Sequence, residues 1–135
     1  MSEPIRIAAA LIDDGEGRIF LVRKRGTAVF MQAGGKIDPG ETAFEALARE
    51  LGEELHFIPA QGDVRFLGTY CGAAANEPGQ LLEAQLFHVP ARGRDLQAAA
   101  ELEEAMWVTI AAAAELHLAP FTRDHVLPLA RALLG

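Results

Sequence analysis

Three glutamates around residue 50 have the residue type and the spacing that a hard metal ion needs. Glu50, Glu53 and Glu54 occupy positions i, i+3 and i+4, so on a helix their carboxylates share one side, away from the apolar residues of the segment. Like charges at these spacings cost roughly 0.2–0.5 kcal/mol per pair, and acids in the last turns oppose the helix dipole. A cation such as Mg2+, which binds carboxylate oxygens, would remove both costs. Taken alone, however, three such acids are more often a solvated helix face.

The segment that carries these acids is predicted to be a helix from Ala43 to Leu55. Pro39-Gly40 signals a turn before it, and Thr42 with Glu45 forms a capping-box pattern. Apolar residues at helical spacing form one stripe that would pack on a core. These are Phe44, Leu47, Ala48, Leu51 and Leu55.

The spacing pattern extends over residues 34–57, GGKIDPGETAFEALARELGEELHF. The positions that matter are Gly35, Glu41, Arg49, Glu50, Leu51, Glu53, Glu54 and Phe57. In this register the stretch resembles the Nudix box, the signature of the Nudix (MutT-like) hydrolases, with Phe57 an aromatic variant of its last position. His56 stands where the family has glycine. A left-handed helix end there would cost a non-glycine residue roughly 1–2 kcal/mol, which predicts an altered helix exit but an intact acidic face.

The resemblance implies a metal site and assigns its ligands. Glu50, Glu53 and Glu54, with the carbonyl group of Gly35, would hold Mg2+ or Mn2+ against the phosphates of a substrate. Glu53 is the candidate general base, although some family members take the base from a loop outside the box. The three glutamates are therefore the central catalytic candidates.

Further acidic residues and one arginine are expected to support the three glutamates. Arg49 belongs to the catalytic set of the box, and we expect it to point off the metal side and to form an ion pair with Glu41 that anchors the loop to the helix. Glu103 and Glu104 precede a Trp-containing strand and are the loop candidates for an additional metal ligand or base. As solvated charges they would need no such role.

Basic residues before the box are candidates for binding phosphate. Arg23, Lys24 and Arg25 end a predicted strand, where charges also serve to protect a sheet edge. Arg23 and Arg25 are favoured because similar basic residues precede the box in many family members. Lys36, next to the paired glycines, could reach phosphate as a point charge.

Composition narrows the class of protein. The chain has 135 residues, half of them hydrophobic, and a net charge of −7, which predicts one domain over residues 1–135 with a single core. The charge argues against binding to duplex nucleic acid. Cys71 is the only cysteine, and we expect it to be a small core residue in a reducing compartment. No apolar run reaches 18 residues, and Met1–Pro4 lacks the features of a signal peptide, so we expect a cytoplasmic protein without membrane contact.

Hairpins dominate the predicted elements, which indicates an α+β fold. The resemblance implies the Nudix fold, a mixed sheet between helices. Strands are expected at 5–12, 18–25, 64–75, 81–89 and 105–109, a turn at 76–79, a short helical turn within 98–104, and helices at 110–116 and 122–134, with Pro128 causing a kink or a late start.

The family implies a metal-dependent pyrophosphohydrolase whose substrate is a nucleoside diphosphate linked to another moiety. The small size favours a nucleoside triphosphate, including an oxidised one, cut to monophosphate and pyrophosphate. ADP-ribose, nucleotide-sugar and dinucleotide substrates stay open, as do a catalytically silent nucleotide-binding module and a structural domain with surface acids. A homodimer is common among relatives.

Overall fold

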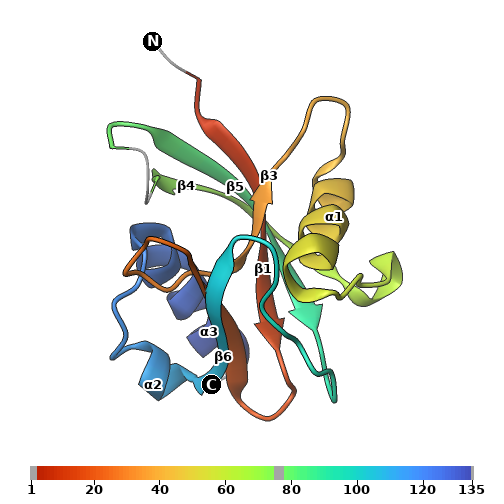
Figure 1. Cartoon of the computed structure of the whole chain (residues 1–135), viewed down its shortest axis with the longest axis vertical. Coiled ribbons are helices and arrows are strands. Elements are labelled where there is room, and N and C mark those ends of the chain that lie inside the picture. The colour runs from red at the N-terminus through yellow and green to blue at the C-terminus, as the bar shows by residue number, and fades with distance from the viewer. Residues whose placement is uncertain (1–2, 75–77, 135) are drawn as a thin grey trace.

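The computed structural model, which describes residues 3–74 and 78–134, is a six-stranded mixed sheet between helices (Figure 1). The strand order is β4-β5-β1-β2-β6, with β3 paired to β1. The helix α1 (Ala43–Leu55) covers one face of the sheet, and α2 and α3 lie on the other. The predicted α+β class and Nudix-type layering are confirmed. The strands are β1 (Ile5–Asp13), β2 (Arg18–Lys24), β3 (Ala33–Lys36), β4 (Arg65–Ala73), β5 (Leu81–Pro90) and β6 (Leu102–Thr109).

The central strand β1 is buried on both faces, as its apolar sequence predicts. Ala8, Ala10 and Ile12 belong to the core beneath α1. The alternate residues, Ile7, Ala9 and Leu11, belong to the core on the α3 side. Because successive side chains of a strand point to opposite faces, this one segment supplies both layers of core.

The first two strands form a hairpin only at their turn. Antiparallel pairing between β1 and β2 is limited to Asp13 and Ile19. Beyond that point β1 pairs antiparallel with β3 and parallel with β5, whereas β2 pairs with β6. The gap that opens between β1 and β2 lets β3 bring Gly34 and Gly35 to the middle of the sheet. The predicted second hairpin, β4 with β5, is confirmed, although Asn76 and Glu77 of its predicted turn lie outside the described residues.

Two expectations about strands are wrong. The segment 98–104 has a turn at Ala100 and Glu101 but no helix, because β6 already begins at Leu102 and pairs with β2. Cys71 is exposed rather than buried. It lies on β4, an edge strand on which roughly every second residue faces solvent.

The C-terminal helices are shorter or less regular than expected. α2 (Ile110–Ala113) ends before residue 116, and a π-helical turn at Thr122–Val126 precedes α3 (Leu127–Leu134). Pro128 has no N–H group to donate, and its ring clashes with the carbonyl group one turn earlier in a regular helix. The wider π-helical turn before Pro128 is therefore the irregularity that the sequence predicts as a kink or a late start. Within the described residues, no helix is both long and apolar enough to cross a membrane.

Candidate functional site

The helix α1 begins and ends as its sequence predicts. The Thr42 hydroxyl accepts a hydrogen bond from the backbone of Glu45 at 3.1 Å, and the Glu45 carboxylate accepts one from the backbone of Thr42 at 2.8 Å, which is the capping box. At the other end His56 has φ 55° and ψ 36°, the left-handed conformation in which glycine is favoured. The register of the acidic residues on the helix is therefore fixed from both ends.

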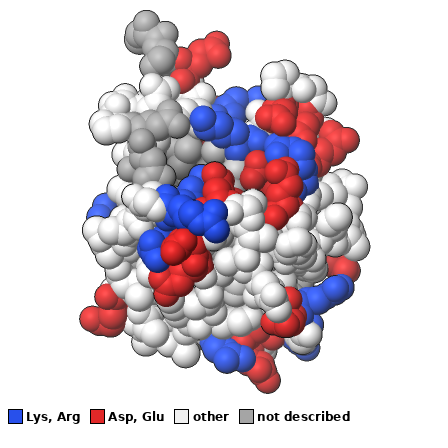
Figure 2. Space-filling view, in the orientation of Figure 1, with Lys and Arg blue, Asp and Glu red and all other residues white. Residues whose placement is uncertain are grey.

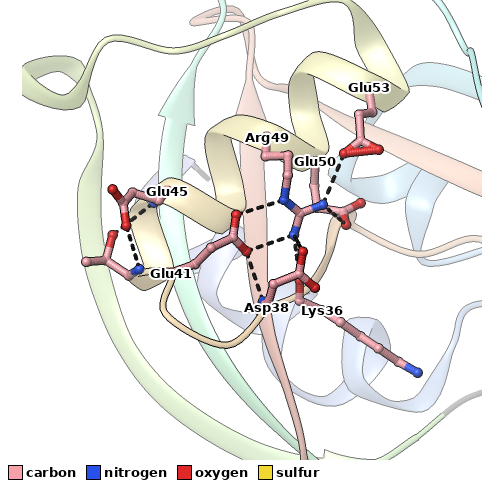
Figure 3. Close-up of polar contacts among 8 residues, drawn as sticks. Lys36, Asp38, Glu41, Glu45, Arg49, Glu50 and Glu53 are labelled. Atoms are coloured by element: carbon pink, nitrogen blue, oxygen red, sulfur yellow. Dashed lines mark hydrogen bonds and ion pairs between the residues drawn. The ribbon is translucent and has the colours of Figure 1, made fainter.

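Arg49 lies at the centre of the polar contacts (Figure 3). Its guanidinium donates two hydrogen bonds to Glu41, at 2.8 and 2.9 Å, and one to the carbonyl of Lys36 at 3.0 Å. The predicted Glu41–Arg49 ion pair is confirmed, and it ties the loop after β3 to α1. These hydrogen bonds hold the pKa of Glu41 down to about 2.

The orientation predicted for Arg49 is wrong. Its Nη1 atom donates to Glu50 Oε1 at 2.9 Å and to Glu53 Oε1 at 3.0 Å, so the guanidinium lies on the acidic side of the helix. Asp38 is within 3.4 Å of the same group. A helical wheel gives only the direction of the Cα–Cβ bond. The prediction fails because the long arginine side chain turns back over the neighbouring residues of the helix. One cation is shared by four carboxylates.

Glu50 packs directly on the backbone of β3. A Cβ atom on Gly35 would lie 2.4–2.7 Å from the atoms of the Glu50 carboxylate, closer than real contacts allow. Glycine at position 35 therefore makes room for this side chain, whose pKa is raised by burial. The Glu50 carboxylate therefore lies against the backbone of Gly35, and a ligand set shared by these two residues stays a prediction.

Glu54 is not on a solvated face, and here the wheel-based expectation fails. The residue is 2% exposed, and its Oε1 accepts a hydrogen bond from the backbone N–H of Gly34 at 3.2 Å. Burial raises the pKa of Glu54 to about 8, because the charged form loses its hydration. Glu53, by contrast, keeps 55% of its side chain exposed. The three glutamates thus occupy three different environments.

The predicted phosphate-binding arginines contact Glu103 and Glu104, and the prediction that these two acids lie in a loop is wrong, because both belong to β6. Arg23 pairs with Glu104 at 3.1 Å, and Arg25 pairs with Glu103 at 3.2 Å. Lys24 lies 3.5 Å from Glu101. Figure 2 shows acidic and basic residues side by side on the face that carries α1 and β6. Roles for Arg23, Arg25, Glu103 and Glu104 in binding or catalysis stay predictions.

A cavity on the α3 side of the sheet borders Gly34 and Gly35. Its walls include the lysines Lys24 and Lys36 and the side chains of Met31, Gln32 and Phe121, together with apolar residues of β1 and β5. The sequence favours the arginines that flank Lys24 and predicts no role for Gln32 or Phe121. The pairing of β2 with β6 shifts in register between Arg23 and Lys24, and such a bulge changes the direction of the side chains that follow.

The residues present fit a hard divalent cation by their chemistry. Glu50, Glu53, Glu54 and the Gly35 carbonyl are all oxygen donors, the class that Mg2+ and Mn2+ prefer. α1 has no basic residue in its last turn, and burial makes two of the carboxylates costly to ionise. In residues 3–74 and 78–134 no three such side chains are already gathered around one point, since Arg49 holds Glu50 and Glu53.

Comparison with known proteins agrees with this geometry. Residues 3–130 match the NUDIX domain family. The chain is 31% identical over 121 residues to the CTP pyrophosphohydrolase of Escherichia coli, covering 86% of this chain and 84% of that protein. It is 36% identical to the 8-oxo-dGTP diphosphatase of Haemophilus influenzae, over 44% of this chain and 47% of that one. The solution structure of the E. coli ORF135 protein superposes with a TM-score of 0.71 at 28% identity, covering 96% of this chain and 88% of that one. The chain therefore belongs to the Nudix family, hydrolases that act on phosphoanhydride bonds of nucleotide-type substrates and generally use divalent metal ions.

Proposed function

We propose that the protein is a nucleoside triphosphate pyrophosphohydrolase that depends on Mg2+ or Mn2+. One water is added across one P–O–P bond, and the products are a nucleoside monophosphate and pyrophosphate. The observation that carries the proposal is the sharing of Arg49 among four carboxylates next to the buried Glu54. Gly35, against which the Glu50 carboxylate packs, also lines the neighbouring cavity.

The ligand set proposed for the cation is Glu50, Glu53, Glu54 and the carbonyl oxygen of Gly35. When bound, the cation neutralises phosphate charge and lowers the pKa of an attacking water. Glu50 would give up its contact with Arg49 Nη1 to take part, and the Gly35 backbone leaves it the space to do so. Glu50 and Glu54 are costly to ionise because they are buried. The positive charge of the bound cation would offset that cost and so favour the move of Glu50 from Arg49 to the cation.

Glu53 is the proposed general base, which takes the proton released as water forms its bond to phosphorus. It is the most exposed of the three glutamates, with 55% of its side chain accessible, so water reaches it without rearrangement. Arg49 and Glu41 hold the loop and the helix in register. Lys24 and Lys36 line the neighbouring cavity and would bind the phosphate oxygens as point charges.

Two observations support a triphosphate. The relative that matches along most of its length is named a CTP pyrophosphohydrolase, and the second relative is named an 8-oxo-dGTP diphosphatase. The residues that line the cavity beside Gly35 include two lysines and several apolar side chains, which suit the phosphates and the base of a nucleotide. The same layout supports the nucleoside lying on the α3 side of the sheet.

A substrate screen tests the proposal. Nucleoside triphosphates, nucleotide sugars, ADP-ribose and dinucleotides would each be incubated with the protein and Mg2+ or Mn2+, with Glu53→Gln in parallel. We expect turnover of triphosphates to monophosphate and pyrophosphate, lost in the variant. Turnover of another class alone would replace the substrate assignment, and metal binding without any turnover would identify a nucleotide-binding module.

A further inference from the structure

Two exposed arginines in the segment after β5 have no part in the proposed reaction. In the part of the chain that the structure describes, neither Arg92 nor Arg94 forms an ion pair with a carboxylate. By contrast, Arg23, Arg25 and Arg49 all contact acids. In a chain with a net charge of −7, two neighbouring cations without acids make a local positive surface, which attracts anions.

The backbone that carries these two arginines is anchored to the core. Ala91 is 2% exposed, and its N–H group donates to the carbonyl of Asp13 at 2.9 Å. The N–H group of Arg94 donates back to the carbonyl of Ala91 at 3.2 Å, which closes a tight turn. Gly93 in that turn has φ 68°, which glycine adopts without strain. Both arginine side chains therefore start from a turn that the core holds in place.

Each guanidinium rests on a feature that is not an acid. A Cβ atom on Gly15 would lie 2.5 Å from Nε of Arg92, so the glycine gives this side chain room against the turn after β1. The guanidinium carbon of Arg94 lies 5.1 Å from the centre of the Phe57 ring, within the range of a cation–π contact. Neither contact takes up the N–H donors of the arginine, which stay available to an anion.

The ring beneath Arg94 is a feature of this chain rather than of the Nudix box. Phe57 is the aromatic variant of the last position of the box, and its side chain belongs to the core beneath α1 with 6% exposed. An aliphatic residue there would fill the same core but would give Arg94 no aromatic face. The departure from the pattern therefore supports the arginine.

Two hollows meet at these arginines. One has a volume of about 430 Å³, and its acids, Asp14 and Glu16, both pair with Arg18, at 2.6 and 3.5 Å. The other has a volume of about 420 Å³ and mainly apolar walls, with Asp63 as its acid; the apolar residues include Phe57, Ile58, Pro59 and Val64. Arg92 and Arg94 line both hollows, so a ligand in either hollow lies beside both residues.

The hollows lie at the opposite end of the sheet from the candidate catalytic site. Arg18, which lines the first hollow, begins β2, whereas Lys24, which lines the cavity at Gly35, ends it. Among the described residues, none lines both that cavity and either hollow. The turn after β1 and the segment after β5 lie at the bottom of Figure 1, and β3 lies above them. A ligand here would bind apart from the phosphates of the substrate.

We propose that Arg92 and Arg94 form a second anion site, which binds a diphosphate group. A guanidinium donates two parallel hydrogen bonds to one phosphate, so two adjacent arginines suit two linked phosphates. The group occurs in free pyrophosphate and in nucleoside diphosphates. The apolar hollow beside Ile58 and Pro59 offers space for a nucleoside, whereas pyrophosphate needs only the arginines. Binding requires neither a divalent cation nor turnover.

Calorimetric titration of pyrophosphate, ADP and orthophosphate into the protein in metal-free buffer tests the proposal. Without a cation the carboxylates around Arg49 repel phosphate, so the signal reports on the second site. Wild type should bind a diphosphate more tightly than orthophosphate. Arg92→Gln/Arg94→Gln should weaken that binding by about 10-fold or more, because charge-assisted hydrogen bonds to both phosphates are lost. No saturable binding by wild type, or equal affinity of wild type and variant, would overturn the proposal.

The three ligands also identify the source of the diphosphate. A higher affinity for ADP than for pyrophosphate would show that the apolar hollow takes the nucleoside, and the ligand is then a nucleotide. A higher affinity for pyrophosphate would identify the free anion. Orthophosphate bound as tightly as either diphosphate would contradict a site built for two linked phosphates.

Two gentler variants separate a built site from general positive charge. Arg94→Lys keeps the charge but loses the planar fork, so the affinity should fall. Phe57→Leu keeps an apolar side chain in the core but removes the ring under Arg94, and it should weaken binding by about 2- to 10-fold. Unchanged affinity in both variants would mean that only net charge attracts the anion, which contradicts the proposed site.

The chain offers a matched control. Arg123 and Arg131 are exposed arginines that line another hollow together with His117, but Arg123 pairs with Asp124 at 2.8 Å. Arg123→Gln/Arg131→Gln removes the same charge as the double variant of the proposed site. Its affinity for the diphosphate should equal that of wild type, and an equal loss in both double variants would overturn the assignment.

Activity measurements keep this site distinct from the catalytic one. Arg92→Gln/Arg94→Gln should unfold at the wild-type temperature and should retain the turnover of wild type. Loss of turnover in the folded variant would place the arginines in the catalytic site and so overturn a second site. If wild type hydrolyses no triphosphate, the proposed function fails, but the metal-free titrations still decide this proposal.

Discussion

Acidic and basic side chains are matched in number around β2 and β6, whereas acidic side chains are in excess around α1. On β2 and β6 and the residues next to them, three cations meet three acids one to one, and the pairs are Arg23–Glu104, Lys24–Glu101 and Arg25–Glu103. On α1 and the loop before it, Arg49 is shared by Asp38, Glu41, Glu50 and Glu53. In the first group each of the six charges has a partner of opposite sign. The second has a surplus of carboxylates beside a buried fifth one, Glu54, and therefore favours a further cation.

The same residue type behaves differently across the second group. The pKa of Glu41 is held down to about 2 by Arg49, whereas burial raises the pKa of Glu54 to about 8. Glu41 is bonded to the Arg49 guanidinium, whereas Glu54 is bonded to the neutral backbone N–H of Gly34. What an acidic residue can bind therefore depends on whether its charge is already neutralised. The following predictions test this interpretation.

The largest effect is expected at Glu53. Glu53→Gln should lower turnover of the triphosphate by about 10²- to 10⁴-fold, the range associated with loss of a general base, while thermal unfolding stays close to wild type. Glu104→Gln, in the balanced group, should change the rate by no more than a few-fold. Steady-state kinetics of both variants decides between them, and the reverse order would assign the base to Glu104 of β6.

The next prediction is that alanine substitutions at the two glycines of β3 have different consequences, for turnover at Gly35 and for folding at Gly34. Gly35→Ala should fold, because its Cβ meets only the end of the Glu50 side chain, but it should lower turnover by about 10- to 100-fold through that displacement. Gly34→Ala should instead unfold the protein, since its Cβ would lie 2.1 Å from the Ala8 carbonyl oxygen at φ 131°. Circular dichroism with activity measurements checks both. Equal activity of Gly35→Ala and wild type would contradict the tight packing of Glu50.

The pH dependence of stability should have opposite signs at the two unlike glutamates. With a chelator present, Glu54 binds a proton more tightly in the folded state, so stability should fall as pH rises from about 4.5 to about 8. Glu54→Gln should flatten that decline. Glu41 has a lowered folded pKa, so its contribution should be lost as pH falls from about 4.5 towards 2, and Glu41→Gln should remove that loss. Urea unfolding across this range measures both slopes, and slopes of the same sign would refute the assignment.

The smallest effect concerns the end of α1. His56 has positive φ, so His56→Gly should relieve strain and raise the free energy of unfolding by up to about 1 kcal/mol, after the extra entropy of glycine in the unfolded chain is subtracted. Turnover should stay within about two-fold of wild type. Chemical denaturation measures the gain, and a clear loss of activity would mean that His56 has a role beyond ending the helix.

The features that sequence predicted well are local ones. α1 was expected from Ala43 to Leu55 and has those bounds, because the capping box and the apolar stripe lie within the segment itself. The Glu41–Arg49 ion pair was also predictable, since both residues lie within one loop and the helix that follows it.

The features that sequence missed depend on distant partners. The start of β6 at Leu102 is set by pairing with β2, and the exposure of Cys71 by the edge position of β4. Burial of Glu54 requires Gly34 to approach α1 closely enough to donate its N–H group. The Gln32–Thr122 hydrogen bond joins residues that are 90 positions apart in the sequence, and no periodicity in either segment predicts it.

The most direct test of the account is calorimetric titration of Mn2+ into the protein without substrate. We predict binding to wild type and to Glu103→Gln/Glu104→Gln, whose charges are balanced, and loss of at least 10-fold in affinity for Glu50→Gln/Glu53→Gln. Absence of binding to wild type, or loss of binding in the β6 variant with retention in the α1 variant, would contradict the claim that the unbalanced carboxylates around Arg49 form the metal site.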